Sequence, residues 1–168
     1  MSSYRRLSVS AAVLSTLFFA SVASQAQPWV GTSGSAVVDE SAVGIYEASI
    51  GQLTYLTGST SSSTISAYFN LTDTSATGNP SWNTLEVAYY DNSPNTLVRA
   101  QIFRVVPGAT STVATCTSTD SSLATRRLCT FTAGAVNFNA GDAYIVAITI
   151  SRSSSADPTP RFYFVRVF

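Results

Sequence analysis

The residue types available for chemistry in this chain are restricted, because it contains no histidine and no lysine. Without them there is no Ser-His-Asp or Cys-His catalysis, no imidazole zinc site and no Schiff base. Carboxylates remain, and a glycoside hydrolase needs two of them at a defined separation across a cleft. The candidates for such a pair are Asp39, Glu40, Glu47, Glu86 and Asp142.

No spacing in the sequence brings two of these carboxylates together. Glu86 alternates with apolar residues and is expected on a solvated strand face, while Asp142 follows Gly141 in a predicted turn. We therefore favour non-catalytic binding and name no catalytic residue. A carboxylate-dependent, carbohydrate-active enzyme is an alternative.

Aromatic and amide side chains suggest a binding surface. Trp82 and Tyr90 offer flat rings on which a sugar could stack, and hydrogen bonds would come from Asp91, Asn92 and Asn95. In the opposing interpretation, Tyr90 packs against a second sheet and Trp82 plugs one end of the fold. The expected ligand is a carbohydrate or another protein.

Two oxygen-rich turns, Asp39-Glu40 and the segment 91–95, have the ligand types that calcium prefers. Neither matches a defined calcium loop, and Asp-Asn-Ser-Pro is also what an ordinary turn requires. We therefore expect no metal or other cofactor, with calcium as the alternative.

The first 26 residues have the pattern of a cleaved secretory signal peptide. Arg5 and Arg6 precede an apolar run over 7–22, and small residues lead to Ala26. The run is too short and too interrupted by serine for a membrane-spanning helix. We expect a single domain over residues 27–168 that is secreted or periplasmic, with association to the cell surface as an alternative.

The cysteines agree with export, and the charge limits the possible partners. Cys116 and Cys129 are the only cysteines, and in an oxidising compartment they are expected to form one disulfide. Residues 27–168 contain seven arginines against nine carboxylates, a net charge of −2. This balance provides no basic footprint for nucleic acid and no polybasic signal for a membrane.

Period-2 alternation of apolar residues dominates after residue 26 and predicts strands. Residues 84–90 and 98–102 are expected to pair as a β-hairpin, as are 111–117 and 127–132. Beyond Ile102 the apolar phase slips, which indicates a bulge or a strand that passes between sheets. Further strands are expected at 43–49, 52–57, 65–71, 144–150 and 161–168.

Eight to ten short strands with turns at this spacing predict an all-β fold, a single antiparallel sandwich of Greek-key or jelly-roll type. Residues 27–40 are expected to be a mobile leader, of which 37–40 joins an edge strand. The C-terminal segment 162–168 also resembles the closing strand of an eight-stranded outer-membrane β-barrel, although Arg166 would then face lipid. It could alternatively be an edge that pairs with another chain.

The order of these parts resembles that of small exported bacterial β-proteins of unassigned role. The resemblance is carried by the leader, the segment from Thr84 to Asp91, the cysteine pair and the segment from Tyr144 to Arg152. It implies export and a sandwich, and it implies nothing about ligand or mechanism.

Overall fold

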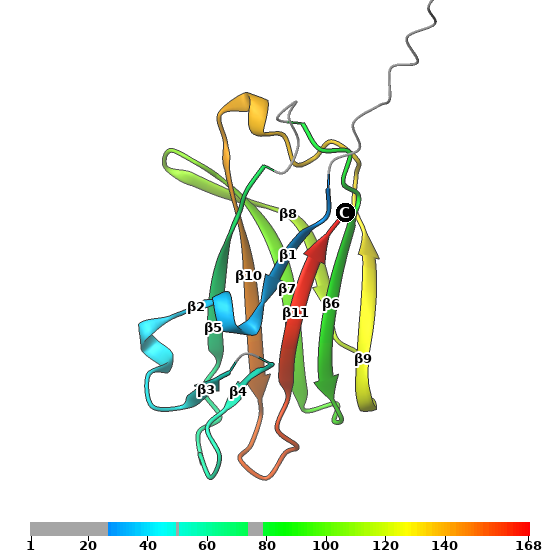
Figure 1. Ribbon diagram of the computed structural model, residues 1–168. Coiled ribbons are helices and arrows are strands. Elements are labelled where there is room, and N and C mark those ends of the chain that lie inside the picture. The colour runs from blue at the N-terminus through cyan, green and yellow to red at the C-terminus, as the bar shows by residue number, and fades with distance from the viewer. Residues whose placement is uncertain (1–26, 50, 74–78) are drawn as a thin grey trace, which may run out of the picture.

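The computed structural model describes residues 27–49, 51–73 and 79–168, which form two antiparallel β-sheets packed face to face (Figure 1). The six-stranded sheet contains β1 (Trp29–Thr32), β3 (Tyr46–Ala48), β4 (Leu53–Tyr55), β6 (Thr84–Asp91), β9 (Ser121–Thr130) and β11 (Arg161–Val167). The five-stranded sheet contains β2 (Val37–Val38), β5 (Ile65–Leu71), β7 (Thr96–Val106), β8 (Ala109–Thr117) and β10 (Ala143–Arg152). The helices described are short 3₁₀ turns: η1 (Ser33–Ser35), η2 (Glu40–Ala42) and η3 (Phe138–Ala140). In the described part of the chain, no helix has the length and apolar character to span a membrane.

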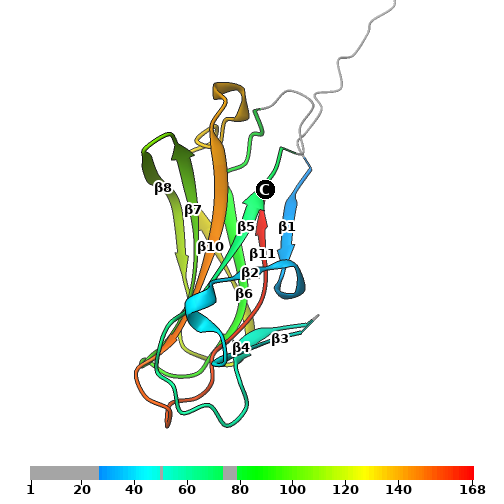
Figure 2. The same ribbon diagram turned by 90° about the vertical axis from the view of Figure 1, so that its left-hand side faces the viewer.

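The strand order is that of a jelly roll. One sheet contains the order β4-β11-β6-β9, and the sheet facing it contains β5-β10-β7-β8. Figure 2 shows β7, β8 and β10 on one side of the molecule and β1 and β11 on the other. From β4 onward, each connection except β7–β8 therefore joins a strand of one sheet to a strand of the other. This confirms the predicted all-β antiparallel sandwich and selects the jelly roll from the two predicted topologies. The described strands form two sheets rather than a single closed one.

The two predicted hairpins were wrong. β6 pairs with β9 and β11, whereas β7 pairs with β8 and β10, so the turn between β6 and β7 joins two sheets. β8 and β9 likewise lie in different sheets. The physical reason is that alternation shows that a strand has one buried face, but it does not show whether the next strand lies beside it or across the core.

The expected irregularity after Ile102 is present as a shift in the register between β7 and β8. Ile102 lies opposite Ala114 and Phe103 lies opposite Thr112, so the extra residue is Val113 of β8. β7 itself stays in its sheet and keeps a continuous register with β10. The bulge is therefore on the neighbouring strand.

The hydrophobic core lies between the two sheets. Leu85, Val87 and Tyr89 of β6 point into it from one sheet, and Val98, Ala100 and Ile102 of β7 do so from the other. Burial of each large apolar side chain contributes about 1.5–3 kcal/mol relative to its exposure to water. This core fixes the outward direction of the alternate residues, which form the surfaces described below.

The segment predicted as a mobile leader is partly a strand. β1 pairs with the second half of β11, and Trp29 packs edge-on against Phe69 of the opposite sheet with ring centroids 6.0 Å apart. Burial of the indole supplies the free energy that orders this segment. β1 and β4 share one edge of β11 and β6 covers the other, so β11 is not a free edge for another chain.

Cys116 and Cys129 form the predicted disulfide, with their Cα atoms 5.4 Å apart. Because β8 and β9 belong to different sheets, the bond joins the two layers at one side of the sandwich. Beside it, Arg127 points away from Arg126 and donates to the Thr117 carbonyl oxygen at 2.5 Å.

Candidate functional site

A cleft of about 470 Å³ lies at the end of the sandwich where β4 ends and β11 begins. Glu47, Gln52 and Thr54 line it from β3, β4 and their connection, and the segment 56–60 lines a second side. The third side is lined by Ser155 and Thr159, which belong to the connection between β10 and β11. Arg152 and Arg161 complete the lining of the cleft. We call this feature the end cleft. Its lining is mainly hydroxyl, amide and charged side chains.

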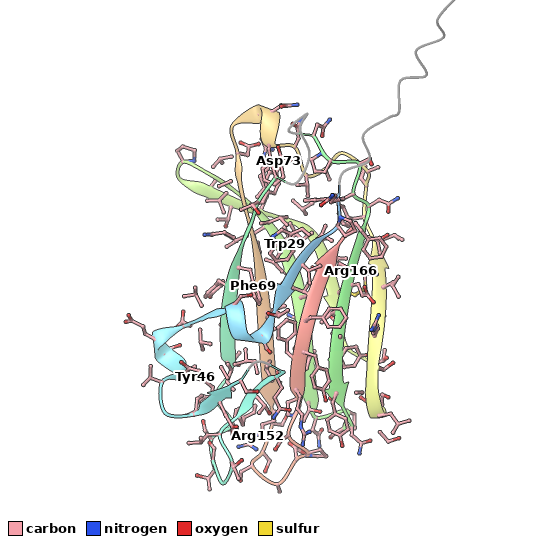
Figure 3. All side chains as sticks on the ribbon, viewed as in Figure 1. Trp29, Tyr46, Phe69, Asp73, Arg152 and Arg166 are labelled. Atoms are coloured by element: carbon pink, nitrogen blue, oxygen red, sulfur yellow. A yellow bond between two sulfur atoms is a disulfide. The ribbon has the colours of Figure 1, made fainter. Side chains whose placement is uncertain are left out.

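Arg152 holds the walls of the end cleft in place. It is only 5% exposed, and it donates to the carbonyl oxygens of Ser59 at 2.6 Å and Ser61 at 2.8 Å. Its guanidinium lies 4.1 Å from the centre of the Tyr55 ring. Burial raises the pKa of Tyr55, whose hydroxyl donates to the Ser63 carbonyl oxygen at 2.6 Å. Figure 3 shows Arg152 at this end of the molecule.

A row of side chains crosses the outer face of the six-stranded sheet at the end cleft. Strand register places Glu47 opposite Thr54, Thr54 opposite Arg161, and Arg161 opposite Tyr90. The Arg161 guanidinium lies 5.5 Å from the centre of the Tyr90 ring. The Thr54 hydroxyl donates to the Pro160 carbonyl oxygen at 2.8 Å, which fixes the start of β11.

Two of the predicted ligand-binding residues lie near the end cleft. Tyr90 is half-buried beneath Arg161, which lines the cleft. Asn95 is exposed and donates to the Asp157 carboxylate at 3.2 Å, and its carbonyl oxygen accepts from Ser153, so it contacts the cleft's third wall. Asn92 is exposed in the same turn.

Trp82 does not join them. It precedes β6, at the opposite end of that strand from Tyr90, and only 2% of it is exposed. Its indole N–H donates to the Gln27 carbonyl oxygen at 3.2 Å, and its ring packs edge-on against Phe138. The surface that Trp82 and Tyr90 were expected to share therefore does not form, because β6 separates them.

Asp91 is also buried, with 1% of its surface exposed. Its carboxylate accepts hydrogen bonds from the hydroxyls of Thr96 and Ser118. At the other predicted calcium turn, Asp39 accepts from Ser41, and hydrogen bonding to Ser41 lowers the pKa of Asp39. Across residues 27–49, 51–73 and 79–168, no cluster of three metal-ligating side chains of the His, Cys, Asp or Glu type is present.

A second set of charges lies on the outer face of the six-stranded sheet, and we call it the arginine face. Arg126 of β9 lies over the Phe164 ring at 5.0 Å, and Arg166 lies over the Phe168 ring at 4.4 Å. Between them is Glu86, whose oxygens are 3.5 Å from Arg126 Nη1 and 2.8 Å from Arg166 Nε. Arg161, which lies over the Tyr90 ring, belongs to both the arginine face and the end cleft.

The prediction that Glu86 lies on a solvated strand face was wrong, because its side chain is only 3% exposed. The two arginines reach over it and bury it, which alternation alone does not reveal. Asp142 pairs with Arg104 of β7 at 2.6 Å, at a turn as expected. Of the five candidate carboxylates, Glu47 is the one that lines the end cleft in the described part of the chain.

The sequence contained a signal for two of the buried charges that our sequence reasoning missed. Arg152 continues the phase of Ile148 and Ile150, and Asp91 continues the phase of Val87 and Tyr89. Extending each alternation by one step would have placed both side chains inside. No comparable pattern identifies the hydroxyl residues of the end cleft, because two separate connections bring them together.

Comparisons with known proteins identify no family. No protein-family model matches the chain, and no curated protein matches it either. Among solved structures, it is similar to an isomalto-dextranase of Arthrobacter globiformis T6 complexed with panose, at 12% identity and a TM-score of 0.47. That similarity covers 83% of this chain and 23% of the dextranase chain. A CBM4 structure is similar at 10% identity and a TM-score of 0.33, over 86% of this chain and 85% of that one. Similarity this low carries no argument about function.

Proposed function

We propose that this chain is an exported, non-catalytic carbohydrate-binding module whose end cleft holds part of a saccharide. The observation that carries the proposal is a polar cleft of about 470 Å³ whose walls are clamped by a buried arginine. Export is supported by the pattern of residues 1–26 and by the disulfide, a bond that persists in oxidising compartments.

The chemistry of the lining fits a saccharide. Sugar hydroxyls both donate and accept hydrogen bonds, and the hydroxyls of Thr57, Ser155 and Thr159 can do the same. Glu47 adds an acceptor for two hydroxyl protons, and Arg161 adds a fork of N–H donors. A preorganised wall lowers the entropic cost of binding, which is what the Arg152 clamp provides.

The carboxylates favour binding over hydrolysis. Glycoside hydrolysis uses two carboxyl groups that flank the scissile bond. In the described cleft, Glu47 is a single carboxylate, and Glu86 is buried beneath arginines on the sheet face. The proposed role is therefore retention of a glycan rather than its cleavage.

Calorimetry with a panel of hexasaccharides tests the proposal. The panel contains β-1,4-linked glucose, xylose and mannose hexamers and a galacturonate hexamer. We expect Glu47→Gln to weaken binding of a recognised hexamer about tenfold or more, the loss of a hydrogen bond to a charged group. Glu40→Gln is the matched control, since Glu40 is exposed on η2 and does not line the cleft. Binding of no hexamer, or equal effects of the two changes, would contradict the proposal.

A further inference from the structure

We propose that the glycan is acidic, and that the arginine face continues the end cleft as the binding surface for a linear, carboxylate-bearing polysaccharide. This inference rests on the proposed function and names the substrate class. Arg161 connects the two surfaces, because it lines the end cleft and also stacks over Tyr90 on the sheet face.

The arginine face repeats one unit three times. Each unit is a guanidinium over an aromatic ring: Arg161 over Tyr90, Arg126 over Phe164, and Arg166 over Phe168. The first unit includes Tyr90 of β6, the second lies on either side of Ala88, and Arg166 of the third lies opposite Glu86. Tyr90, Ala88 and Glu86 are alternate residues of β6. Alternate residues on one face of a strand are about 6.7 Å apart, so the three cations are distributed along the strand rather than clustered at one point.

The local charge selects an anion. Three guanidiniums are present and the carboxylate between them, Glu86, is 3% exposed, whereas the Arg126 side chain is 60% exposed. Glu47 is the further carboxylate on this side, in the row that contains Arg161. Residues 27–168 contain more carboxylates than arginines, so the positive excess belongs to this face and not to the whole molecule.

The same geometry favours a carboxylated sugar over a nucleic acid. Binding of single strands relies on open aromatic faces on which bases stack. Here the aromatic faces are covered by guanidiniums, and the planar fork of a guanidinium matches the two oxygens of a carboxylate.

A hollow provides space for a sugar ring in the middle of the face. It has a volume of about 280 Å³ and is lined by Ala88, Arg126, Tyr163 and Phe164, among others. Ala88 forms part of its lining, because a small side chain stands between Arg126 on one neighbouring strand and Phe164 on the other. The register shift between Phe162 and Phe164 turns the Tyr163 side chain toward the same hollow.

The test compares a galacturonate hexamer with a galacturonate dimer, a neutral hexamer and a single-stranded oligonucleotide. We expect the acidic hexamer to bind more tightly than the others and to weaken as salt rises. Arg126→Gln is expected to weaken the acidic hexamer about tenfold and to leave a neutral hexamer unaffected. Arg166 still neutralises Glu86 in this variant, and circular dichroism checks that the fold is retained.

Arg104→Gln is the matched control, because Arg104 is an exposed arginine of the opposite sheet. Equal binding of acidic and neutral hexamers, unchanged binding in Arg126→Gln, or tighter binding of the oligonucleotide would overturn this inference. The two proposals can fail separately. Loss through Glu47→Gln with no effect of Arg126→Gln supports the end cleft alone, and the reverse result supports the arginine face without the cleft.

Discussion

Asp91 illustrates how a single buried charge connects loops of this molecule. It ends β6, yet its carboxylate accepts hydrogen bonds from Thr96 at the start of β7 and from Ser118 after β8. The Ser118 hydroxyl in turn accepts from the backbone N–H of Val98 at 2.9 Å. One carboxylate therefore ties together the ends of three strands from both sheets.

We predict that Asp91→Ala lowers the free energy of unfolding by about 2–3 kcal/mol, because the buried Thr96 hydroxyl and the half-buried Ser118 hydroxyl lose a charged acceptor. Urea denaturation followed by fluorescence measures the loss. Asp120→Ala is the matched control, since Asp120 is exposed in the connection between β8 and β9 and should change the free energy by less than about 0.5 kcal/mol. Equal losses in the two variants would show that the network is not stabilising.

For single residues, residue type and the alternation of apolar and polar positions determine which features could be predicted from the sequence. The disulfide was predicted from the two cysteines together with the secretory pattern of residues 1–26, and burial of Leu85, Val87 and Tyr89 was predicted from alternation. Burial of Glu86 could not be predicted, because it depends on arginines from β9 and β11 that reach over it. Neighbours across a sheet are set by register, which is a long-range property.

At the scale of elements, the disulfide connects two sheets rather than two arms of one hairpin. β8 and β9 are the outermost strands of their sheets on this side, and each has a neighbour on one edge only. The bond therefore holds the sandwich closed at a side where β8 and β9 are not paired as neighbouring strands. In contrast, β7 and β8 form a true hairpin around Gly108, whose φ of 78° suits glycine.

We predict that the double variant Cys116→Ala, Cys129→Ala has a free energy of unfolding about 3 kcal/mol lower than that of the wild type. This is the value expected for a short cross-linked loop. Hydrogen exchange should rise in β8 and β9 before it rises in β11. Reduced wild-type protein separates the cross-link from the lost sulfur atoms, because it retains the buried Cys116 side chain. Equal stability of reduced and oxidised wild type would contradict a stabilising role for the bond.

The fold class could be predicted from the sequence, but the pairing of the strands could not. Period-2 patterns identified the long strands and an antiparallel sandwich, but the sheet to which each belongs depends on the path of its connections. The turn of residues 92–95 has the composition of a hairpin turn and nevertheless carries the chain from one sheet to the other. The end cleft was unpredictable for the same reason, since its walls are the connections after β4 and β10.

At the scale of the whole molecule, β1 joins the two layers on the side opposite the disulfide. It hydrogen-bonds to β11 in one sheet, and Trp29 packs on Phe69 of the other (Figure 3). Gly31 lies directly beneath this contact. A Cβ atom there would be 2.7 Å from Trp29 Cη2 and 2.9 Å from Phe69 Cδ1, and each ring is held by the other.

We therefore predict that Gly31→Ala lowers the free energy of unfolding by about 1–3 kcal/mol, the usual cost of overpacking. Gly51→Ala is the matched control, because its Cβ would have no atom within 4 Å. Urea denaturation measures the global loss and hydrogen exchange measures the release of β1. A global loss in Gly31→Ala alone would show that β1 belongs to the cooperative unit. An unchanged free energy with rapid exchange in β1 would contradict this, since the sandwich would then close without it.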